Sequence, residues 1–476
     1  MEFLESFVAF TNDILWSYVL IVMLVGLGIW FSLRTRFVQV RCLKEMVRLL
    51  KEGVGQKTEH NHISSFQAFC VSTASRVGVG NIAGIAIAIV SGGPGAIFWM
   101  WIIAILGSAT GFIESTLAQI YKVPREGGGY RGGPAYYIKQ ALKAPVLGGV
   151  FAVFLILTYM GGFNALASFN LADFVKAYVP SENATLYIGI VVALLSAIVI
   201  FGGGKRISKA TQVIVPIMAI AYIAVALIVI VLNISSFPSV IAGIFKGAFN
   251  FTSVSGGIFG ATIMNGIKRG LYSNEAGIGS APNAAASADV SHPVKQGLVQ
   301  MLSVFIDTLL ICSSTAFMVL CAGVDPVKYV DEAGNALSGA YIQDSLGVNF
   351  GAFGGIFITA ALALFAYTTL VGNYFYAEMN ISYLYKNALN NKPFMFFYRL
   401  IAVLIIFVGA QFSASLAWDT ADVLMGMMAL INVPVCIILG GTAFKALRDY
   451  TSRKKAGMPL EFKAADIGVK GTDYWQ

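Results

Sequence analysis

The stretch Arg76-Val-Gly-Val-Gly-Asn-Ile-Ala-Gly-Ile85 lies inside a long apolar run and decides the fold, because the second half of the chain repeats it. Its counterpart, Arg269-Gly-Leu-Tyr-Ser-Asn-Glu-Ala-Gly-Ile278, aligns without a gap and shares the Arg, Asn, Ala, Gly and Ile positions. Glycine costs about 1 kcal/mol relative to alanine in a helix interior, so both stretches predict interrupted helices. In lipid, the freed backbone groups need partners, so each interruption is predicted to line a cavity or bind a ligand. The alternative is a pair of glycine kinks packed against neighbouring helices.

The composition places the chain in a membrane. Of its 476 residues, 57% are hydrophobic and 12% are charged, which is about half the charged fraction of an ordinary soluble domain. Basic loops explain the net charge of +8 better than a nucleic-acid partner does. Apolar runs that could cross a lipid bilayer occur at residues 14–33, 64–90, 96–121, 146–175, 184–201, 210–232, 256–288, 297–322, 351–384, 394–412 and 421–444. We predict an all-α integral membrane protein with eleven transmembrane helices, in a plasma (inner) membrane.

Basic residues collect in alternate loops, which predicts an orientation. They are concentrated at residues 34–57, 122–143 and 205–209, and again from residue 445 onward. The loop at 325–344 is acidic instead. Because Lys and Arg are retained on the cytoplasmic side, the N-terminus is expected outside and the C-terminus in the cytoplasm.

The spacing of the two repeated stretches predicts an inverted repeat. Five further spans separate the spans that carry them, so equivalent helices would cross the membrane in opposite directions. The expected organisation is an extra N-terminal helix (1–36), a cytoplasmic interfacial helix and loop (37–63, helical at 40–50), a first five-helix repeat (64–233), an outer interfacial segment (234–255, helical at 240–251), a second five-helix repeat (256–445) and a cytoplasmic tail (446–476).

Three motifs resemble those of the alanine or glycine:cation symporter family. They are the long signature from Gly92 to Gly107 (GGPGAIFWMWIIAILG), the segment from Gly78 to Gly84 (GVGNIAG) and the segment from Tyr272 to Pro282 (YSNEAGIGSAP). The resemblance covers nearly the whole chain. It implies a leucine-transporter-like core of ten helices with one extra N-terminal span, which couples sodium entry to uptake of a neutral amino acid. Sodium would be the coupling ion, and no other cofactor is expected.

The interrupted helices supply the expected substrate groups. Backbone N–H groups freed near a helix N-terminus suit a carboxylate, and freed carbonyls suit an ammonium or sodium. Val79, Gly80 and Asn81 are expected to hold the carboxylate, although Asn81 could instead cap the helix break. The candidates for the facing wall are Tyr272, Ser273 and Asn274. The family resemblance implies substrate-lining roles for Asn81, for residues 272–274 and for Thr369.

Sodium prefers oxygen ligands and needs no titrating group. Thr368 and Thr369, together with the backbone near Val77, are the sodium candidates. Threonine in a membrane helix also bonds back to its own carbonyls, which is the structural alternative.

The substrate's size is suggested by departures from the family's pattern. Asn373 stands where carriers of alanine or glycine typically have tryptophan, and Ala167 stands where they have glutamine, with Asn164 and Asn170 nearby. Val79 replaces a usual threonine. An amide in place of an indole predicts a roomier, more polar pocket for a substrate such as glutamine. Shifted neighbours could refill the space and leave a carrier of small amino acids.

Ionisable residues at membrane depth are functional candidates by default. They are Arg76, Glu114, Asp173, Arg269, Glu275, Asp307 and Glu378. Arg76 and Arg269 are expected to pair with Glu114 or Glu275, as structural locks or gates. A proton-driven carrier stays open as an alternative to sodium coupling. A membrane enzyme is least favoured, because the three histidines lie in loops and show no metal-site spacing.

Overall fold

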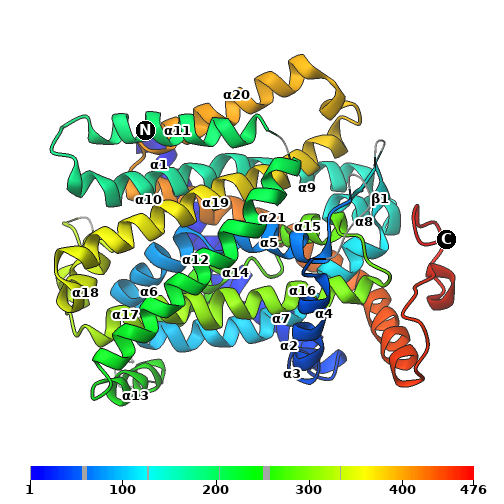
Figure 1. The fold of residues 1–476 in the computed structure, drawn as a ribbon, viewed down its shortest axis with the longest axis horizontal. Helices are drawn as coiled ribbons and strands as arrows, with labels where there is room; N and C mark the ends of the chain where they lie inside the picture. The colour runs from blue at the N-terminus through cyan, green and yellow to red at the C-terminus, as the bar shows by residue number, and fades with distance from the viewer. Residues whose placement is uncertain (1, 56–61, 126–127, 203, 250–257, 333) are drawn as a thin grey trace.

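The computed structural model describes residues 2–55, 62–125, 128–202, 204–249, 258–332 and 334–476, and these residues are almost entirely helical (Figure 1). The strands within them, β1 (Val123–Pro124) and β2 (Tyr130–Arg131), form one short antiparallel hairpin. The fold is therefore a bundle of helices, as the composition predicts.

The helices of the first half run from the N-terminal segment through the first interrupted helix to α12. In chain order they are α1 (Glu2–Ile14), η1 (Leu15–Val19), α2 (Leu20–Arg34), α3 (Val38–Arg41), α4 (Leu43–Gly53), α5 (Ser65–Arg76), η2 (Gly80–Gly84), α6 (Ile85–Gly92), α7 (Gly95–Ile120), α8 (Pro134–Ala141), α9 (Pro145–Ile156), η3 (Leu157–Gly162), α10 (Phe163–Val175), η4 (Lys176–Tyr178), α11 (Ala184–Ile200) and α12 (Gly204–Leu232).

The second half begins with a short amphipathic helix, and its longest helix, α21, has 42 residues. Its helices are α13 (Phe237–Ala248), α14 (Ile258–Asn274), α15 (Ala281–Ser287), α16 (Pro293–Val304), η6 (Phe305–Cys312), α17 (Ser313–Cys321), η7 (Pro326–Lys328), α18 (Ser338–Phe350), α19 (Ala352–Leu384), η8 (Ala388–Asn390), α20 (Lys392–Gly409), α21 (Ala414–Lys455) and η9 (Ala464–Ile467).

Eight helical stretches of the described residues are long and apolar enough to cross a membrane, and the bent pair Ser65–Arg76 and Gly80–Gly92 makes a ninth. The multi-pass prediction is confirmed at this coarser count. Besides this bent pair, two of the eleven predicted spans fall short of a single long helix. The run at 184–201 forms α11, which has 17 residues. The run at 256–288 is divided between α14 and α15, and residues 256–257 lie outside the described part of the chain.

Both repeated stretches interrupt their helices where the glycines lie. The first helix bends by 54° between Arg76 and Gly80, and Val77 there adopts an extended conformation with ψ of 90°. In the second, Glu275 and Gly277 have φ of +55° and +94°, a left-handed backbone that favours glycine. Because Glu275 is not glycine, this left-handed backbone conformation is strained there.

Helices are present in both segments that the sequence predicts to be interfacial. Residues 40–50 fall in α3 and α4, where Met46 and Leu49 are buried while Lys44 and Arg48 are exposed. The predicted outer segment at 240–251 corresponds to α13; residues 250 and 251 lie outside the described residues.

Helix α7 packs against α14 and α16 in the lower part of the view (Figure 1). A Cβ atom added at Gly270 of α14 would lie 2.7 Å from the Ile103 side chain of α7, so this close approach requires glycine. Gly270 lies four residues before Asn274, where α14 ends at the second interruption.

Candidate functional site

Asn81 closes the first break. Its side-chain Oδ1 accepts a 2.7 Å hydrogen bond from the Gly78 backbone N–H, and its own N–H donates to the Gly78 carbonyl at 3.1 Å. The side chain is fully buried. The cap that the sequence offered as an alternative is therefore present, and it occupies the amide oxygen of Asn81 only.

The amide nitrogen of Asn81 reaches across the bundle. It donates to Asp307 Oδ1 at 2.7 Å, from η2 to η6. Ser273, one residue before the end of α14, donates its hydroxyl to the other Asp307 oxygen at 2.7 Å. The Asp307 carboxylate thus joins the two interrupted helices, and its third donor is the Thr308 hydroxyl at 2.9 Å.

Asp307 is a fully buried carboxylate whose hydrogen-bond donors are all neutral amide and hydroxyl groups. A carboxylate charge without a cation in direct contact is unfavourable at this depth, so the site favours either a bound cation or a proton. From sequence, Asp307 is a candidate only as one of the ionisable residues at membrane depth. Its position inside an apolar run was the available signal, but that signal does not reveal its partners.

The two threonine candidates for sodium point in different directions. Thr369 Oγ1 lies 3.2 Å from the Ala74 carbonyl oxygen, and its side chain fills the space beside Gly78 at the first break. Thr368 Oγ1 instead bonds the Phe365 carbonyl at 3.0 Å and lies 3.7 Å from the Met218 sulfur of α12. Only Thr369 therefore faces the break, together with the buried Val77.

Asn164 and Asn373, predicted to shape the substrate pocket, are brought together. Asn373 Nδ2 donates to Asn164 Oδ1 at 3.0 Å, and the Ser75 hydroxyl lies 2.7 Å from Asn373 Oδ1. Ser75 Oγ is also 3.1 Å from a Glu275 oxygen, and the Ser280 hydroxyl donates to that carboxylate at 2.7 Å. This chain of polar groups links α10 and α19 to both breaks.

Asn170 does not join this group. Its amide nitrogen donates at 2.9 Å to the Leu166 carbonyl of its own helix. Asn274 behaves similarly, because its side-chain oxygen accepts from the Ala276 N–H at 3.0 Å and so caps the second break.

The Tyr272 side chain, next to the second break, packs over Gly80 at the first break. A Cβ at Gly80 would lie 2.6 Å from the Tyr272 ring, so glycine is required for this contact. The ring also packs against Phe163, with centroids 4.9 Å apart, and against Trp418, 5.2 Å apart. Val79, which precedes Gly80, is also buried.

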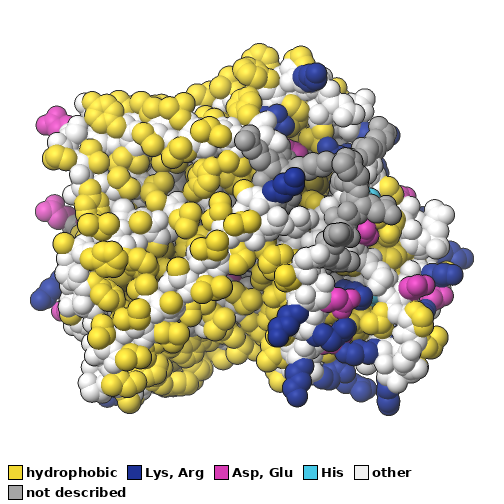
Figure 2. Space-filling model, in the orientation of Figure 1, with side chains coloured by type: hydrophobic (Ala, Val, Ile, Leu, Met, Phe, Trp, Pro, Cys, Tyr) yellow, Lys and Arg dark blue, Asp and Glu magenta, His cyan; other side chains and the backbone are white. Residues whose placement is uncertain are grey.

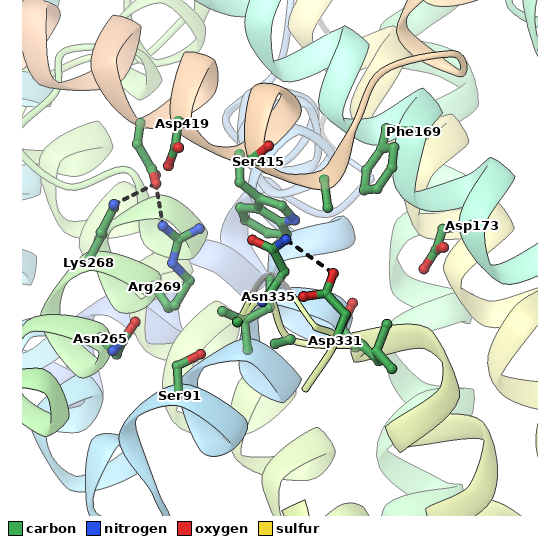
Figure 3. Close-up of a pocket in the computed structure, with 18 residues that line it drawn as sticks. Ser91, Phe169, Asp173, Asn265, Lys268, Arg269, Asp331, Asn335, Ser415 and Asp419 are labelled. Atoms are coloured by element: carbon green, nitrogen blue, oxygen red, sulfur yellow. Dashed lines mark hydrogen bonds and ion pairs between the residues drawn. The ribbon is translucent and has the colours of Figure 1, made fainter. Parts of the chain in front are cut away.

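The expected partners of Arg269 are wrong. Its guanidinium pairs with Asp422 of α21, not with Glu114 or Glu275, and Lys268 Nζ lies 2.9 Å from the same carboxylate. Figure 3 shows Lys268 and Arg269 directed at one carboxylate on the wall of a cavity of about 250 Å³, which Asp419 and Trp418 also line. Asp422 falls inside the predicted span at 421–444 but was not among the ionisable candidates, whereas Asp419 precedes that span, because α21 begins earlier, at Ala414.

Arg76 and Glu114 are not paired with each other either. The Arg76 guanidinium donates to the Ser303 hydroxyl and, at 3.4 Å, to the Gln300 carbonyl. Glu114 accepts from the Gly277 N–H at 3.3 Å and from Asn432 at 2.9 Å. Glu114 therefore stabilises the second break from α7, and no ion pair between these two residues forms.

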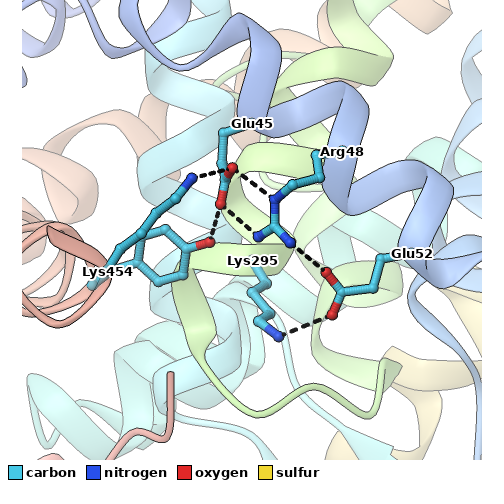
Figure 4. A network of polar contacts seen from close by, with 6 residues as sticks. Glu45, Arg48, Glu52, Lys295 and Lys454 are labelled. Atoms are coloured by element: carbon cyan, nitrogen blue, oxygen red, sulfur yellow. Dashed lines mark hydrogen bonds and ion pairs between the residues drawn. The ribbon is translucent and has the colours of Figure 1, made fainter. Parts of the chain in front are cut away.

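A second polar network lies where α4 meets the bundle (Figure 4). Glu45 accepts two hydrogen bonds from Arg48, at 2.9 and 2.8 Å, one from Tyr450 at 2.5 Å, and one from Lys454. Hydrogen bonding from Arg48, above all, lowers the pKa of Glu45 to about 2. Lys295 at the start of α16 pairs with Glu52 at 3.4 Å, so the network ties α4 to α16 and α21.

Comparison with known proteins agrees with this architecture. The family model described as "Sodium:alanine symporter family" matches residues 1–464. The chain is 46% identical over 475 residues to the "Probable sodium/glutamine symporter GlnT" of Bacillus subtilis, with 100% of this chain and 96% of that protein covered. It is 37% identical over 460 residues to the "Sodium/alanine symporter AgcS" of Methanococcus maripaludis, covering 96% and 99%.

Among solved structures, MhsT in complex with L-phenylalanine superposes with a TM-score of 0.56 at 15% identity, covering 82% of this chain and 93% of that one. This likeness concerns the fold, which is that of leucine-transporter-like proteins. The match of the family model over nearly the whole length, together with these relatives, establishes that the chain belongs to the sodium:alanine symporter family.

Proposed function

We propose that this chain is a sodium-coupled symporter that imports a neutral amino acid by alternating access. One observation carries the proposal: the Asp307 carboxylate receives donors from both interrupted helices, through Asn81 and Ser273. A cation bound at this carboxylate would contact both breaks, so ion binding and substrate binding would be coupled through the same backbone. Thr369 would supply a further oxygen beside the first break.

The proposal includes the finer organisation that the sequence suggests. Eleven spans would form two inverted five-helix repeats (64–233 and 256–445) after one extra helix (1–36). The interfacial segments at 37–63 and 234–255 and the tail at 446–476 would lie outside the bilayer. The N-terminus would be outside and the C-terminus cytoplasmic, in the plasma (inner) membrane.

The proposed substrate is glutamine. The Asn164–Asn373 pair supports it, because two amides beside the breaks can both donate to and accept from a side-chain amide. The name of the glutamine symporter among the relatives points the same way. A carrier of alanine or glycine is the competing possibility within this proposal.

Proton coupling is the second candidate. Asp307 and Glu275 are both fully buried, and the Ser75 and Ser280 hydroxyls that face Glu275 are neutral. A relative from Bacillus sp. strain PS3 is named "Sodium/proton-dependent alanine carrier protein".

Uptake of radiolabelled glutamine, alanine and glycine into proteoliposomes tests both candidates. An imposed inward sodium gradient at constant pH is expected to drive accumulation of glutamine. Accumulation driven by a pH gradient without sodium would replace sodium coupling with proton coupling. A preference for alanine or glycine would refute the substrate proposal while leaving the coupling intact.

A further inference from the structure

A groove lined by four arginines lies on the basic side of the molecule. It encloses about 310 Å³ between the end of α2, the turn into α3 and the last turns of α21. Its arginines are Arg34, Arg36, Arg41 and Arg448, and its apolar lining comes from Phe444 and Leu447. Figure 2 shows Lys and Arg side chains gathered at the lower right of the view, in the region where Figure 1 labels α2 and α3.

The four guanidiniums have no acidic partner among the described residues, and no acidic residue lines the groove. Nearby basic residues behave differently: Arg48 pairs with Glu45, and Arg453 pairs with Asp449 at 2.9 Å. Four like charges around one groove repel each other. The groove therefore favours an anion from outside the chain.

Three of these arginines are constrained by neighbouring groups or by the backbone. The Arg34 guanidinium lies 5.2 Å from the Trp30 ring centroid and 5.4 Å from that of Phe444. Arg41 Nη2 donates to the Thr35 carbonyl at 3.1 Å. Arg36 adopts a left-handed backbone with φ of +56°, which is uncommon outside glycine and marks a constrained turn.

Apolar side chains next to these arginines in the sequence are exposed. The exposed fractions are 47% for Trp30, 57% for Leu33, 50% for Phe37 and 67% for Val40. Tryptophan beside arginine is typical of the boundary between hydrocarbon and headgroups. The groove is therefore expected to open at the depth where lipid phosphates lie.

We propose that this groove binds the headgroup of an anionic phospholipid and thereby joins α2 to α21. The planar guanidinium forks of the four arginines match phosphate oxygens, and the exposed apolar side chains match the acyl chains attached to that phosphate. A free phosphate would use the arginines but leave the apolar side chains without a partner. The lipid accounts for both features.

The test uses the purified full chain in detergent and fluorescently labelled phosphatidylglycerol. The groove variant combines Arg34→Gln, Arg36→Gln, Arg41→Gln and Arg448→Gln. A matched control removes the same charge from exposed positions elsewhere, with Lys143→Gln, Lys392→Gln, Lys463→Gln and Lys470→Gln. The groove variant is expected to bind at least about tenfold more weakly than wild type, because each basic residue near an anionic lipid adds to the attraction. The control is expected to stay within about threefold of wild type.

Size-exclusion and thermal unfolding profiles check that the variants fold. If the quadruple variant is unfolded, Arg36→Gln with Arg448→Gln leaves the Arg34 stacking and the Arg41 bond intact and is expected to weaken binding severalfold. Equal losses in groove and control variants would overturn the proposal. So would equal binding of phosphatidylcholine, or complete competition by inorganic phosphate, which would identify a free-phosphate site.

Discussion

Asn81 donates a 2.7 Å hydrogen bond to the Asp307 carboxylate, across 226 positions of sequence. The same asparagine caps the first helix break through Gly78. The conformation of the break and the charge of the carboxylate are therefore linked by one side chain. A cation that displaces this bond would also alter the cap, which gives ion binding a direct route to the substrate-facing backbone.

Asp307→Asn is expected to raise the sodium concentration for half-maximal uptake by more than about tenfold. At about 4 Å, a unit charge interacts with about 4 kcal/mol at an effective dielectric of 20, and the substitution removes that attraction while keeping the side-chain shape. Sodium titration of glutamine uptake in proteoliposomes measures the shift. Thr308→Val removes one donor but leaves the carboxylate, so it is expected to change the half-saturation little. Unchanged sodium dependence in Asp307→Asn would place the ion elsewhere.

The neighbouring threonines of α19 form a matched pair. Thr369→Val is expected to weaken sodium binding several times more than substrate binding when each is titrated separately, because the Thr369 hydroxyl faces the first break. Thr368→Val is expected to leave sodium affinity nearly unchanged, because that hydroxyl bonds its own helix. The opposite ranking would contradict the assignment of the sodium-facing position.

The Asp422 carboxylate pairs with both Lys268 and Arg269, so removing its charge is expected to destabilise the protein. Asp422→Asn leaves Lys268 and the buried Arg269 without their shared partner, and removing one member of a buried pair costs about 3–5 kcal/mol. The unfolding temperature and the initial rate of uptake are both expected to fall. Asp419→Asn serves as control, because the Asp419 side chain accepts a hydrogen bond from Asn12 and remains partly exposed.

A double variant separates the charge effect from a general packing defect. Arg269→Gln combined with Asp422→Asn removes both members of the pair and is expected to recover part of the lost stability. If the double variant is as unstable as the sum of the single losses, the two residues are not energetically coupled.

The interruptions were predictable from sequence because glycine acts locally. Gly78 and Gly80 lie inside an apolar run, and the same pattern recurs near Gly277, so the breaks follow from backbone preferences and the cost of unpaired groups in lipid. The capping role of Asn81 was also foreseeable as an alternative, since its partner Gly78 is three residues away.

The partners that decide the chemistry were not predictable in the same way. Asp307 meets Asn81 and Ser273 only after distant helices pack, and no spacing rule specifies that meeting. Adjacent residues of a helix point in different directions, so Thr368 and Thr369 have different neighbours. Both were equally good candidates in the sequence. The carboxylate partner of Arg269, Asp422, lies inside the predicted last span, but it is 153 positions away in sequence, so no local pattern links the two residues.

Glu45 gives a pH-dependent prediction outside the spans. Its pKa is lowered to about 2 in the folded protein, from 4.5, so the unfolded chain binds the proton more readily. The contribution of Glu45 to stability is therefore complete above about pH 4.5 and is lost as the pH falls toward 2. Glu45→Gln is expected to lower the unfolding temperature at pH 7 and to flatten its decline between pH 5 and 3, relative to wild type. Glu52→Gln is the matched control, because that carboxylate is 48% exposed and its ion pairs contribute about 0–1 kcal/mol. Equal effects of the two substitutions in a detergent-based thermal unfolding series would show that the buried contacts of Glu45 with Tyr450 and Lys454 do not anchor α4.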